Sequence, residues 1–521
     1  MLNKNALLAS FTLLLAIFAN AQTAYGQQEV RVRELPGLDI QRGWKSKTEK
    51  RVRNLFTGGA LRTGSKTAQA AVTGKLRLPV VVVDFLDGRL VYPPSRLGDR
   101  MFGNPTDLIS VAQYYAEMSN DLFTVTGDVS SIPIQLPYNS AWYVGNRGIG
   151  GVADRLDVFL NDILYRAAAL FDWRLFDNDG VDGVPNSGDD DGYVDVLVIV
   201  YSTPDGSCSA TNNGKMWAHR WNLASVLGHP FDTGAKTPDG KPIYIDDYIA
   251  IPAYDCDGQR LAPMGILIHE IGHVLGLPDL YPTDPQVPSE GVGYWDLMGS
   301  GNWNTPEYPA ALGAWSRLML GWVNAIEVTD AVNLTIPPVH VAREVVLVPS
   351  PVAADYLLLE YRTRIDNGPD MHLKQEGLVV WQVDPERVEQ FWETNEINND
   401  PGAPGIAVIQ ADGRNDLELG LCCGGNRGDA GDVWPNVWTG ARSLTHETTP
   451  AAVTLASKTP LQVRLDNIRI ENNAVVLDVT PGLEPYAIVE LSSNIGGVRA
   501  TLNGAIAIAL PYTGQWPVGS T

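Results

Sequence analysis

The chain has 521 residues, which is longer than one typical domain and predicts two or three folded units. Hydrophobic residues make up 45% of it, enough for a sizeable core, while 51 Gly and 35 Pro indicate a turn-rich, β-rich protein rather than a helical bundle. The formal net charge of -22 argues against partners that are themselves anionic, namely nucleic acids and anionic membrane surfaces.

The N-terminus has the features of a secretory signal peptide. Lys4 supplies positive charge, residues 6–18 form an apolar stretch too short to span a bilayer, and an Ala-x-Ala site predicts cleavage after Ala21. An uncleaved anchor is the alternative, which the cleavage site disfavours. We therefore expect a signal peptide over 1–21 and an exported, extracellular protein. We expect no stable membrane insertion, because no later segment approaches the length of a transmembrane helix.

Residues 22–72 are basic and weakly apolar, in contrast to the acidic remainder of the chain. This composition is typical either of a removable pro-segment or of a flexible linker. A pro-segment of this charge could cover an acidic cleft until it is removed.

The next part of the chain alternates strand-like and helix-like segments. Nearly continuous β-branched runs predict buried strands at 76–85 and 193–201, and amphipathic patterns predict helices at 111–118 and 151–170. Such alternation favours an α/β layer.

An Asp- and Gly-rich loop precedes the second of these strands. Alternating acids offer oxygen ligands and Gly permits sharp turns, as in calcium loops, although no Glu closes a twelve-residue EF-hand pattern. A solvated acidic loop or a series of Asx turns is the alternative. The candidate calcium ligands are Asp177, Asp179, Asp182, Asp191 and Asp195.

Export makes the four cysteines candidates for disulfides. Cys208 and Cys256 could pair with each other, whereas a bond between the adjacent Cys422 and Cys423 would be strained. Pairing between the first two cysteines and the last two stays open.

His219 lies between Trp217 and Trp221 in the sequence. It could assist transition-state binding in a cleft, or it could be a structural histidine.

The strongest motif is the segment 269–279, which reads His-Glu-Ile-Gly-His-Val-Leu-Gly-Leu-Pro-Asp. A helix is predicted over 264–275, and His269 and His273 are four residues apart on it, so they share one face and can reach a single metal ion. Glu270 lies one residue round and can reach a metal-bound water instead of the metal.

Two further residues extend the motif. Gly276 lets the chain leave the helix with a positive φ, and the resulting turn would bring Asp279 round as a third, oxygen ligand. An ordinary buried helix with a chance HExxH is the alternative, and the full HExxHxxGxxD spacing disfavours it.

These residue types define the chemistry. Zn2+ lowers the pKa of a bound water toward about 7 and polarises a scissile carbonyl. Glu270 would act as general base, taking the proton of that water and passing it to the leaving amine. Asp279 adds a negative charge that a histidine ligand would not, so we expect a higher pKa for the water than with three histidines.

Past residue 322 short alternating strands predominate, separated by turn residues, which predicts a β-sandwich-like second domain. Its Asp429 and Asp432 could bind a second calcium ion or cap a turn. We make no assignment for the tail at 483–521. The predicted strands lie at 345–348, 356–361, 377–383, 463–468 and 474–479.

A second segment, residues 293–303, places Met298 in a turn a few tens of residues after Asp279, like the Met-turn that packs beneath the metal in metzincins. Together with HExxHxxGxxD it resembles the immune inhibitor A family of secreted metallopeptidases. The resemblance spans about residues 76–480. The other similar segments are 78–87, 110–119, 216–221, 313–322, 357–362, 377–384 and 426–435.

The resemblance implies that His269, His273 and Asp279 bind zinc, that Glu270 is the general base and that Met298 is the Met-turn residue. It also implies an α/β (α+β) metzincin-like catalytic domain over 73–330, followed by a β-rich, sandwich-like domain over 331–482. The resemblance favours Ca2+ as a second metal. Gln382 departs from the His that the family commonly has there, which affects nothing catalytic.

The resulting hypothesis is a secreted zinc endopeptidase that acts on protein or peptide substrates. A non-catalytic exported binding or adhesion protein on the same scaffold is the alternative, and the intact Glu270 disfavours it. A processing enzyme of narrow specificity is a third possibility. The cleavage preference depends on pockets that are assembled from scattered loop residues. The oligomeric state stays open.

Overall fold

The computed structural model describes residues 71–145, 153–180, 183–209 and 214–482, together with the backbone of four short strands between 486 and 517. The predicted signal peptide, nearly all of the basic segment and the candidate ligand Asp182 lie outside the described residues. Within the described part, no helix is both long and apolar enough to cross a membrane.

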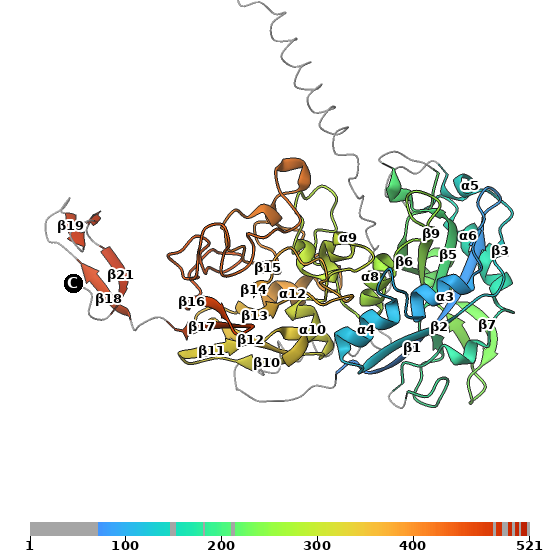
Figure 1. Ribbon diagram of the computed structural model, residues 1–521, viewed down its shortest axis with the longest axis horizontal. Coiled ribbons are helices and arrows are strands. Elements are labelled where there is room, and N and C mark those ends of the chain that lie inside the picture. Colours follow the sequence, from blue (N-terminus) through green and yellow to red (C-terminus); the bar gives the residue numbers. More distant parts are fainter. Residues whose placement is uncertain are drawn as a thin grey trace, which may run out of the picture.

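A mixed six-stranded sheet forms the centre of the N-terminal region (Figure 1). Its main path runs β2-β1-β5-β9-β6, with β3 paired to β1, and only β6 is antiparallel to its neighbour. The predicted strand at 76–85 is therefore present as β1. The strands are β1 (Gly74–Asp84), β2 (Phe123–Val129), β3 (Ile134–Gln135), β5 (Leu197–Pro204), β6 (His219–Asn222) and β9 (Asp247–Tyr254).

Helices cover both faces of this sheet because both faces of β1 are apolar. Val80 and Val82 belong to a core shared with α3 (Ser95–Phe102) and α4 (Val111–Ser119), the helix predicted at 111–118. Val81 and Val83 point to the other face and share a core with α6. The remaining helices of this second face are α5 (Ser140–Val144), α6 (Leu156–Ala167) and α7 (Leu223–Leu227).

Two predicted elements differ from the structure. The helix expected at 151–170 begins only at Leu156, because the backbone N–H groups of Asp154 and Arg155 donate to carbonyls at the end of α5. The strand expected at 193–201 is split, because the N–H of Asp195 donates to the carbonyl of Phe176 and interrupts the ladder. Its first part, β4 (Tyr193–Val194), joins a small sheet with β8 (Pro242–Ile245) and β7 (Phe231–Lys236).

The C-terminal region is built from two sheets with a common apolar core. One has the order β10-β12-β13-β14-β15 and the other the order β11-β17-β16, and all five strands predicted there are present. The strands are β10 (Asn324–Glu327), β11 (Val332–Ile336), β12 (Glu344–Pro349), β13 (Tyr356–Arg362), β14 (Gly377–Val383), β15 (Ile406–Val408), β16 (Val463–Glu471) and β17 (Ala474–Pro481).

Beyond residue 482 the backbone forms two strand pairs. β18 (Tyr486–Leu491) pairs with β21 (Tyr512–Pro517), and β19 (Arg499–Leu502) pairs with β20 (Ile506–Ala509), both antiparallel. The domain limits inferred from the sequence stay predictions.

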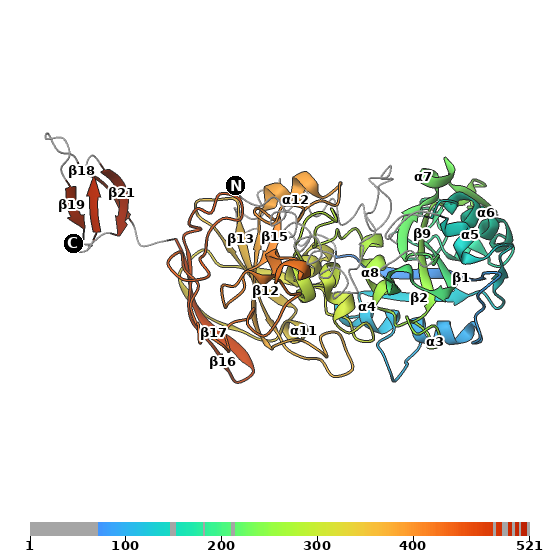
Figure 2. The same cartoon turned by 90° about the horizontal axis from the view of Figure 1, so that it is seen from above.

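The helix that carries the histidine motif, α8 (Gly265–Val274), lies between the two regions (Figures 1 and 2). It packs on the same core as α4, and the hydroxyl of Tyr115 donates to the carbonyl of Ile268 over 2.6 Å. That core continues through α10 (Ala314–Leu320) into β13 and β14, where Trp381 is fully buried. The motif helix is thus packed against both halves of the chain.

Candidate metal centre

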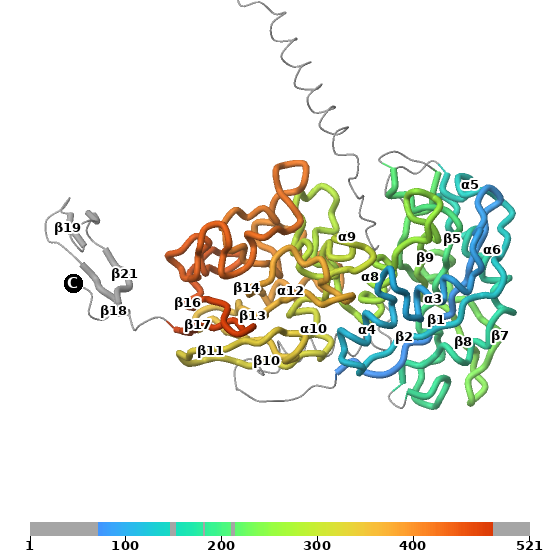
Figure 3. The backbone as a smooth tube through the Cα atoms, in the orientation of Figure 1, coloured from blue at the N-terminus to red at the C-terminus, as the bar shows by residue number. Residues whose placement is uncertain are grey.

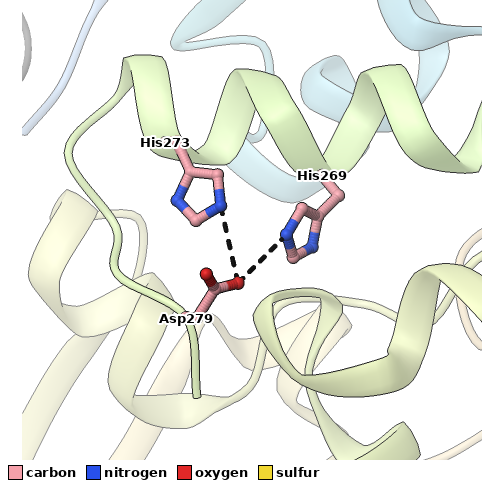
Figure 4. Close-up of side chains that lie close together, drawn as sticks. All are labelled: His269, His273 and Asp279. Carbon is pink, nitrogen blue, oxygen red and sulfur yellow. Dashed lines mark ion pairs between the residues drawn. The ribbon is translucent and has the colours of Figure 1, made fainter. Parts of the chain in front are cut away.

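His269 and His273 point from one face of α8 toward Asp279 (Figure 4). Their Nε2 atoms lie 3.2 Å and 3.5 Å from the same carboxylate atom, Oδ1 of Asp279. All three side chains are buried, with 5% or less of each residue exposed. The spacing in the sequence therefore brings the three predicted ligands together, and their ligand atoms lie within 4.8 Å of one another.

The turn after the helix has the conformation expected from its glycine. Gly276 has a φ of +93°, in the left-handed region that favours glycine, and its N–H donates to the carbonyl of His273. The N–H of Leu277 donates to the carbonyl of Gly272, which reverses the chain and directs Asp279 back beneath the histidines.

Backbone carbonyls orient both imidazoles. Nδ1 of His269 donates to the carbonyl of Leu297 over 2.9 Å, and Nδ1 of His273 donates to the carbonyl of Leu277 over 2.8 Å. Because a carbonyl can only accept, each Nδ1 must carry a hydrogen. Each Nε2 therefore faces Asp279 either with a lone pair or, if the ring is cationic, with a second proton.

The donor set fits a zinc ion. Oδ1 of Asp279 is buried and accepts no hydrogen bond of normal geometry from any described residue. Two imidazole nitrogens and one carboxylate oxygen are ligand types that zinc prefers, with one position left open in catalytic sites. A cation among these three atoms would satisfy all of them at once.

The charge of Asp279 is stabilised by its surroundings. Burial by itself raises the pKa of this carboxyl, but the imidazoles of His273 and His269 outweigh that effect and hold the pKa well below its usual range. The second carboxylate oxygen, Oδ2, accepts a hydrogen bond of 2.8 Å from Nδ2 of Asn395. The neighbours of Asp279 thus favour its carboxylate form.

Met298 lies directly beneath the motif helix. A Cβ added at Gly272 would meet Sδ of Met298 at 2.5 Å, so only a glycine allows this contact. Met298 belongs to the turn η4 (Leu297–Gly301), which Asp296 stabilises by accepting hydrogen bonds from the N–H groups of Met298 and Gly313. Met298 therefore packs against α8 at Gly272, and the carbonyl of its neighbour Leu297 orients His269.

A cleft with about 740 Å3 of empty space opens above the three ligands. Glu270 lines it beside His269, His273 and Asp279, as the order of residues in the motif predicts. Glu270 is only partly buried, which leaves its carboxylate accessible from the cleft.

His219 lines the same cleft and is buried. Its Nδ1 donates to the carbonyl of Trp217 over 2.8 Å, and its Nε2 lies 3.1 Å from the hydroxyl of Tyr248. Burial lowers the pKa of His219, which favours the neutral ring. These contacts fit the structural interpretation, while its place in the cleft leaves a role in transition-state binding as a prediction.

A disulfide joins Cys208 and Cys256, which is one of the pairings that the sequence left open. It links the chain that follows β5 to the chain that follows β9, close to the cleft residues Asp205 and Ser207. Cys422 and Cys423 are exposed thiols. A covalent tie therefore supports one wall of the cleft.

The acidic loop forms a second group of ligand atoms. Carboxylate oxygens of Asp177, Asp179 and Asp195 lie within 4.8 Å of one another, and Asp191 raises the pKa of Asp177 through its charge. Oδ1 of Asp177 and Oδ2 of Asp195 are buried without a hydrogen-bond partner among the described residues. Burial first, then the neighbouring carboxylates, raise the pKa of Asp177 to about 8. Three of the five predicted calcium candidates are thus close together, and the charge of a fourth, Asp191, acts on Asp177.

The contact between Asn395 and Asp279 could not be predicted from the sequence. Asn395 lies 116 residues after Asp279, and no local pattern links the two. The pairing follows from the fold, which brings the segment after α12 (Pro385–Phe391) against the turn after α8.

Comparison with known proteins finds similarity to metallopeptidases. Residues 92–324 match the family described as Immune inhibitor A peptidase M6, catalytic domain. The chain is 28% identical over 260 residues to the Pre-pro-metalloprotease PrtV of Vibrio cholerae serotype O1, covering 45% of this chain and 27% of that protein. It is 30% identical over 227 residues to Immune inhibitor A of Bacillus thuringiensis subsp. alesti, covering 41% of this chain and 31% of that protein.

These matches confirm the resemblance drawn from the motifs. The chain spans less than a third of the length of these curated relatives. The matched family region contains the three candidate ligands, Glu270 and Met298, and it ends before Asn395.

Proposed function

We propose that this chain, which belongs to the immune inhibitor A peptidase family through its domain at residues 92–324, is a zinc-dependent endopeptidase of proteins or peptides. One observation carries the proposal. Two imidazole nitrogens and one carboxylate oxygen converge on a single point at the floor of a cleft, and their other polar atoms are already engaged by the protein. Such an arrangement supports a metal centre with an open side.

In the proposed reaction, His269, His273 and Asp279 hold the zinc ion. Bound zinc supplies Lewis acidity, which makes water a better nucleophile at neutral pH and polarises a carbonyl. The carboxylate of Glu270, at the edge of the same cleft, takes the proton of the attacking water and delivers it to the leaving nitrogen.

Replacing Glu270 tests this assignment. Glu270→Gln removes the proton acceptor but keeps the size of the side chain, so we expect kcat/KM on casein to fall by roughly 10²–10⁴-fold. Zinc content, measured by metal analysis of the purified mature protein, should stay at one ion per chain.

Glu389→Gln is the matched control, because Glu389 is an exposed residue of α12 outside the cleft. It should leave both activity and zinc content unchanged. Full activity in Glu270→Gln would exclude Glu270 as the general base. Folded wild type without zinc would favour the non-catalytic binding protein instead.

We propose calcium as a second metal, held by Asp177, Asp179 and Asp195, with the charge of Asp191 also acting on Asp177. The support is the buried, unpartnered Oδ1 of Asp177, together with the like charges around it. Calcium takes six to eight oxygen ligands, including carboxylates and carbonyls, which this loop can offer. Isothermal titration of chelator-treated protein with Ca2+ tests this proposal, and Asp177→Asn should weaken the binding.

We also propose that the protein is exported and acts outside the cell after loss of its first segments. The amino-terminal features of the sequence support this part of the proposal. Sequencing of the protein recovered from the medium should give Gln22 as the first residue, or a later one if the basic segment is also removed. An N-terminus at Met1 would contradict it.

A further inference from the structure

Asn395 contacts the candidate metal ligand Asp279 with both ends of its amide. Its Oδ1 accepts a hydrogen bond of 2.7 Å from the backbone N–H of Asp279, and its Nδ2 donates to Oδ2 of the same residue over 2.8 Å. One side chain thus fixes the backbone position and the carboxylate orientation of Asp279 together.

The surrounding chain holds Asn395 in place. Trp392 and Ile397 are buried in the core that also contains α8, and the N–H of Asn395 donates to the carbonyl of Trp392. Figure 3 shows α12, the helix that leads into this segment, on the side of the β-rich region that faces α8. The segment is therefore part of the interface between the two regions.

Two more asparagines bind the chain just after Asp279. Nδ2 of Asn398 donates to the carbonyl of Leu280, and Oδ1 of Asn399 accepts from the N–H groups of Thr283 and Asp284. These contacts fix the course of the backbone, whereas Asn395 alone of the three contacts the carboxylate.

The two oxygens of Asp279 consequently differ. Oδ2 is engaged by Asn395, while Oδ1 faces both imidazoles and has no other partner among the described residues. Without the amide the carboxylate could rotate about its terminal torsion, which is broad for aspartate. Hydrogen bonds of this kind orient metal ligands, and their removal typically weakens metal binding by 10–100-fold.

We propose that Asn395 is a positioning residue of the metal centre: it presents Oδ1 of Asp279 to the zinc ion, so that the β-rich region contributes to metal affinity. The inference rests on the proposed zinc site. It extends beyond the family-matched domain, because Asn395 lies outside residues 92–324.

The backbone at Asn395 determines which substitution is informative. Its φ is +55°, a left-handed conformation that asparagine, aspartate and glycine tolerate better than other residues. Asn395→Asp keeps this conformation and the acceptor for the N–H of Asp279, but it replaces the donor to Oδ2 with a carboxylate oxygen. Asn395→Gly removes both contacts and keeps the backbone conformation.

Asn399→Asp is the matched control. It makes the same substitution four residues away, keeps the acceptor for Thr283 and Asp284, and loses only a 3.3 Å bond from Nδ2 to the hydroxyl of Thr283. It does not touch Asp279.

The experiment measures zinc affinity of the full mature chain by competition with a chromophoric chelator, and visible absorption after Co2+ substitution. We expect Asn395→Asp and Asn395→Gly to bind zinc 10–100-fold more weakly than wild type and to shift the Co2+ bands. Asn399→Asp should stay within about threefold of wild type, with an unchanged spectrum.

Three results would overturn the inference in different ways. Wild-type affinity and spectrum in both Asn395 variants would exclude a positioning role. An equal loss in Asn399→Asp would show that the segment acts only through its overall fold. Absence of zinc from folded wild type would overturn the proposed function itself, so the two failures are distinguishable. If one Asn395 variant does not fold, the other decides the outcome.

Discussion

The molecule has two groups of candidate metal ligands, one around Asp279 and one around Asp177. They differ in which neighbours surround the carboxylate. Around Asp279 the protein supplies two imidazoles, which hold the pKa of the carboxyl well below its usual range despite burial, and an asparagine amide that donates to Oδ2. Around Asp177 it supplies mainly further carboxylates, and with burial they raise the pKa to about 8.

The difference indicates two different relations between metal and fold. The first group has favourable neighbours of its own, so we expect its geometry to persist without a cation. The second repels itself when ionised, and a bound cation would remove that repulsion. We therefore expect loss of zinc to abolish the reaction with little cost in stability, and loss of calcium to reduce stability first.

The largest expected effect is on zinc binding and activity, in a variant of the group around Asp279. His273→Ala removes a proposed zinc ligand, so we expect bound zinc to be lost and casein cleavage to fall by roughly 10³-fold or more. Calcium should still raise the melting temperature of this variant. His229→Ala, at an exposed histidine outside the cleft, serves as the control in metal analysis and activity assays.

A melting temperature of His273→Ala that no longer responds to calcium would contradict the separation of the two sites. So would unfolding of the variant at room temperature, because the first group would then be needed for the fold.

The second effect concerns the acidic loop. Calcium at 100 times its dissociation constant should stabilise the protein by about 2.7 kcal/mol, which corresponds to a rise of roughly 5–10 °C in melting temperature. Asp177→Asn removes one of the repelling charges, so we expect a higher melting temperature than wild type in chelator and a smaller response to calcium. Differential scanning calorimetry measures both.

A calcium response of Asp177→Asn equal to that of wild type would remove Asp177 from the site. In that case the buried, unpartnered oxygen at Asp177 would need another explanation.

Local patterns in the sequence predicted the first group well. The four-residue spacing on α8 and the glycine at 276 determine where His269, His273 and Asp279 meet, because both act over less than four helical turns. The strands β1, β12, β13 and β14 could also be predicted from the sequence, because continuous apolar runs identify buried strands without knowledge of their partners.

Contacts between distant segments could not be predicted in this way. Asn395 looks like an ordinary loop residue, and only the shared core around Trp392 and Ile397 brings it to Asp279. The split of the strand at 193–201 has the same origin, because the partner of Asp195 is the carbonyl of Phe176, nineteen positions earlier in the chain. Hydrophobic periodicity contains no information on such pairings.

Asp432 tests whether a buried aspartate outside the two candidate metal groups responds to pH instead of to calcium. It is buried like Asp177, yet among the described residues it belongs to no group of three ligands close enough to hold a metal. Its Oδ2 accepts hydrogen bonds from Nε1 of Trp295 and the N–H of Asp429, and Asp429 in turn accepts from the N–H of Gly431. This geometry favours the turn-capping alternative, so Asp432 should respond to protons rather than to calcium.

Burial, the largest cause, raises the pKa of Asp432 to about 7, whereas an aspartate in the unfolded chain titrates near about 3.9. Between about pH 4 and pH 7 the folded state therefore binds more protons at this group, and the free energy of unfolding falls as the pH rises. Asp432→Asn cannot ionise but keeps an oxygen acceptor for Trp295. Relative to wild type it should gain stability of roughly 3–4 kcal/mol between pH 4 and pH 8, because the pKa of Asp432 in the folded state lies about three above that in the unfolded chain. Urea unfolding at both pH values, with calcium present throughout, measures this gain; a constant difference between the two proteins would mean that Asp432 stays ionised across the range.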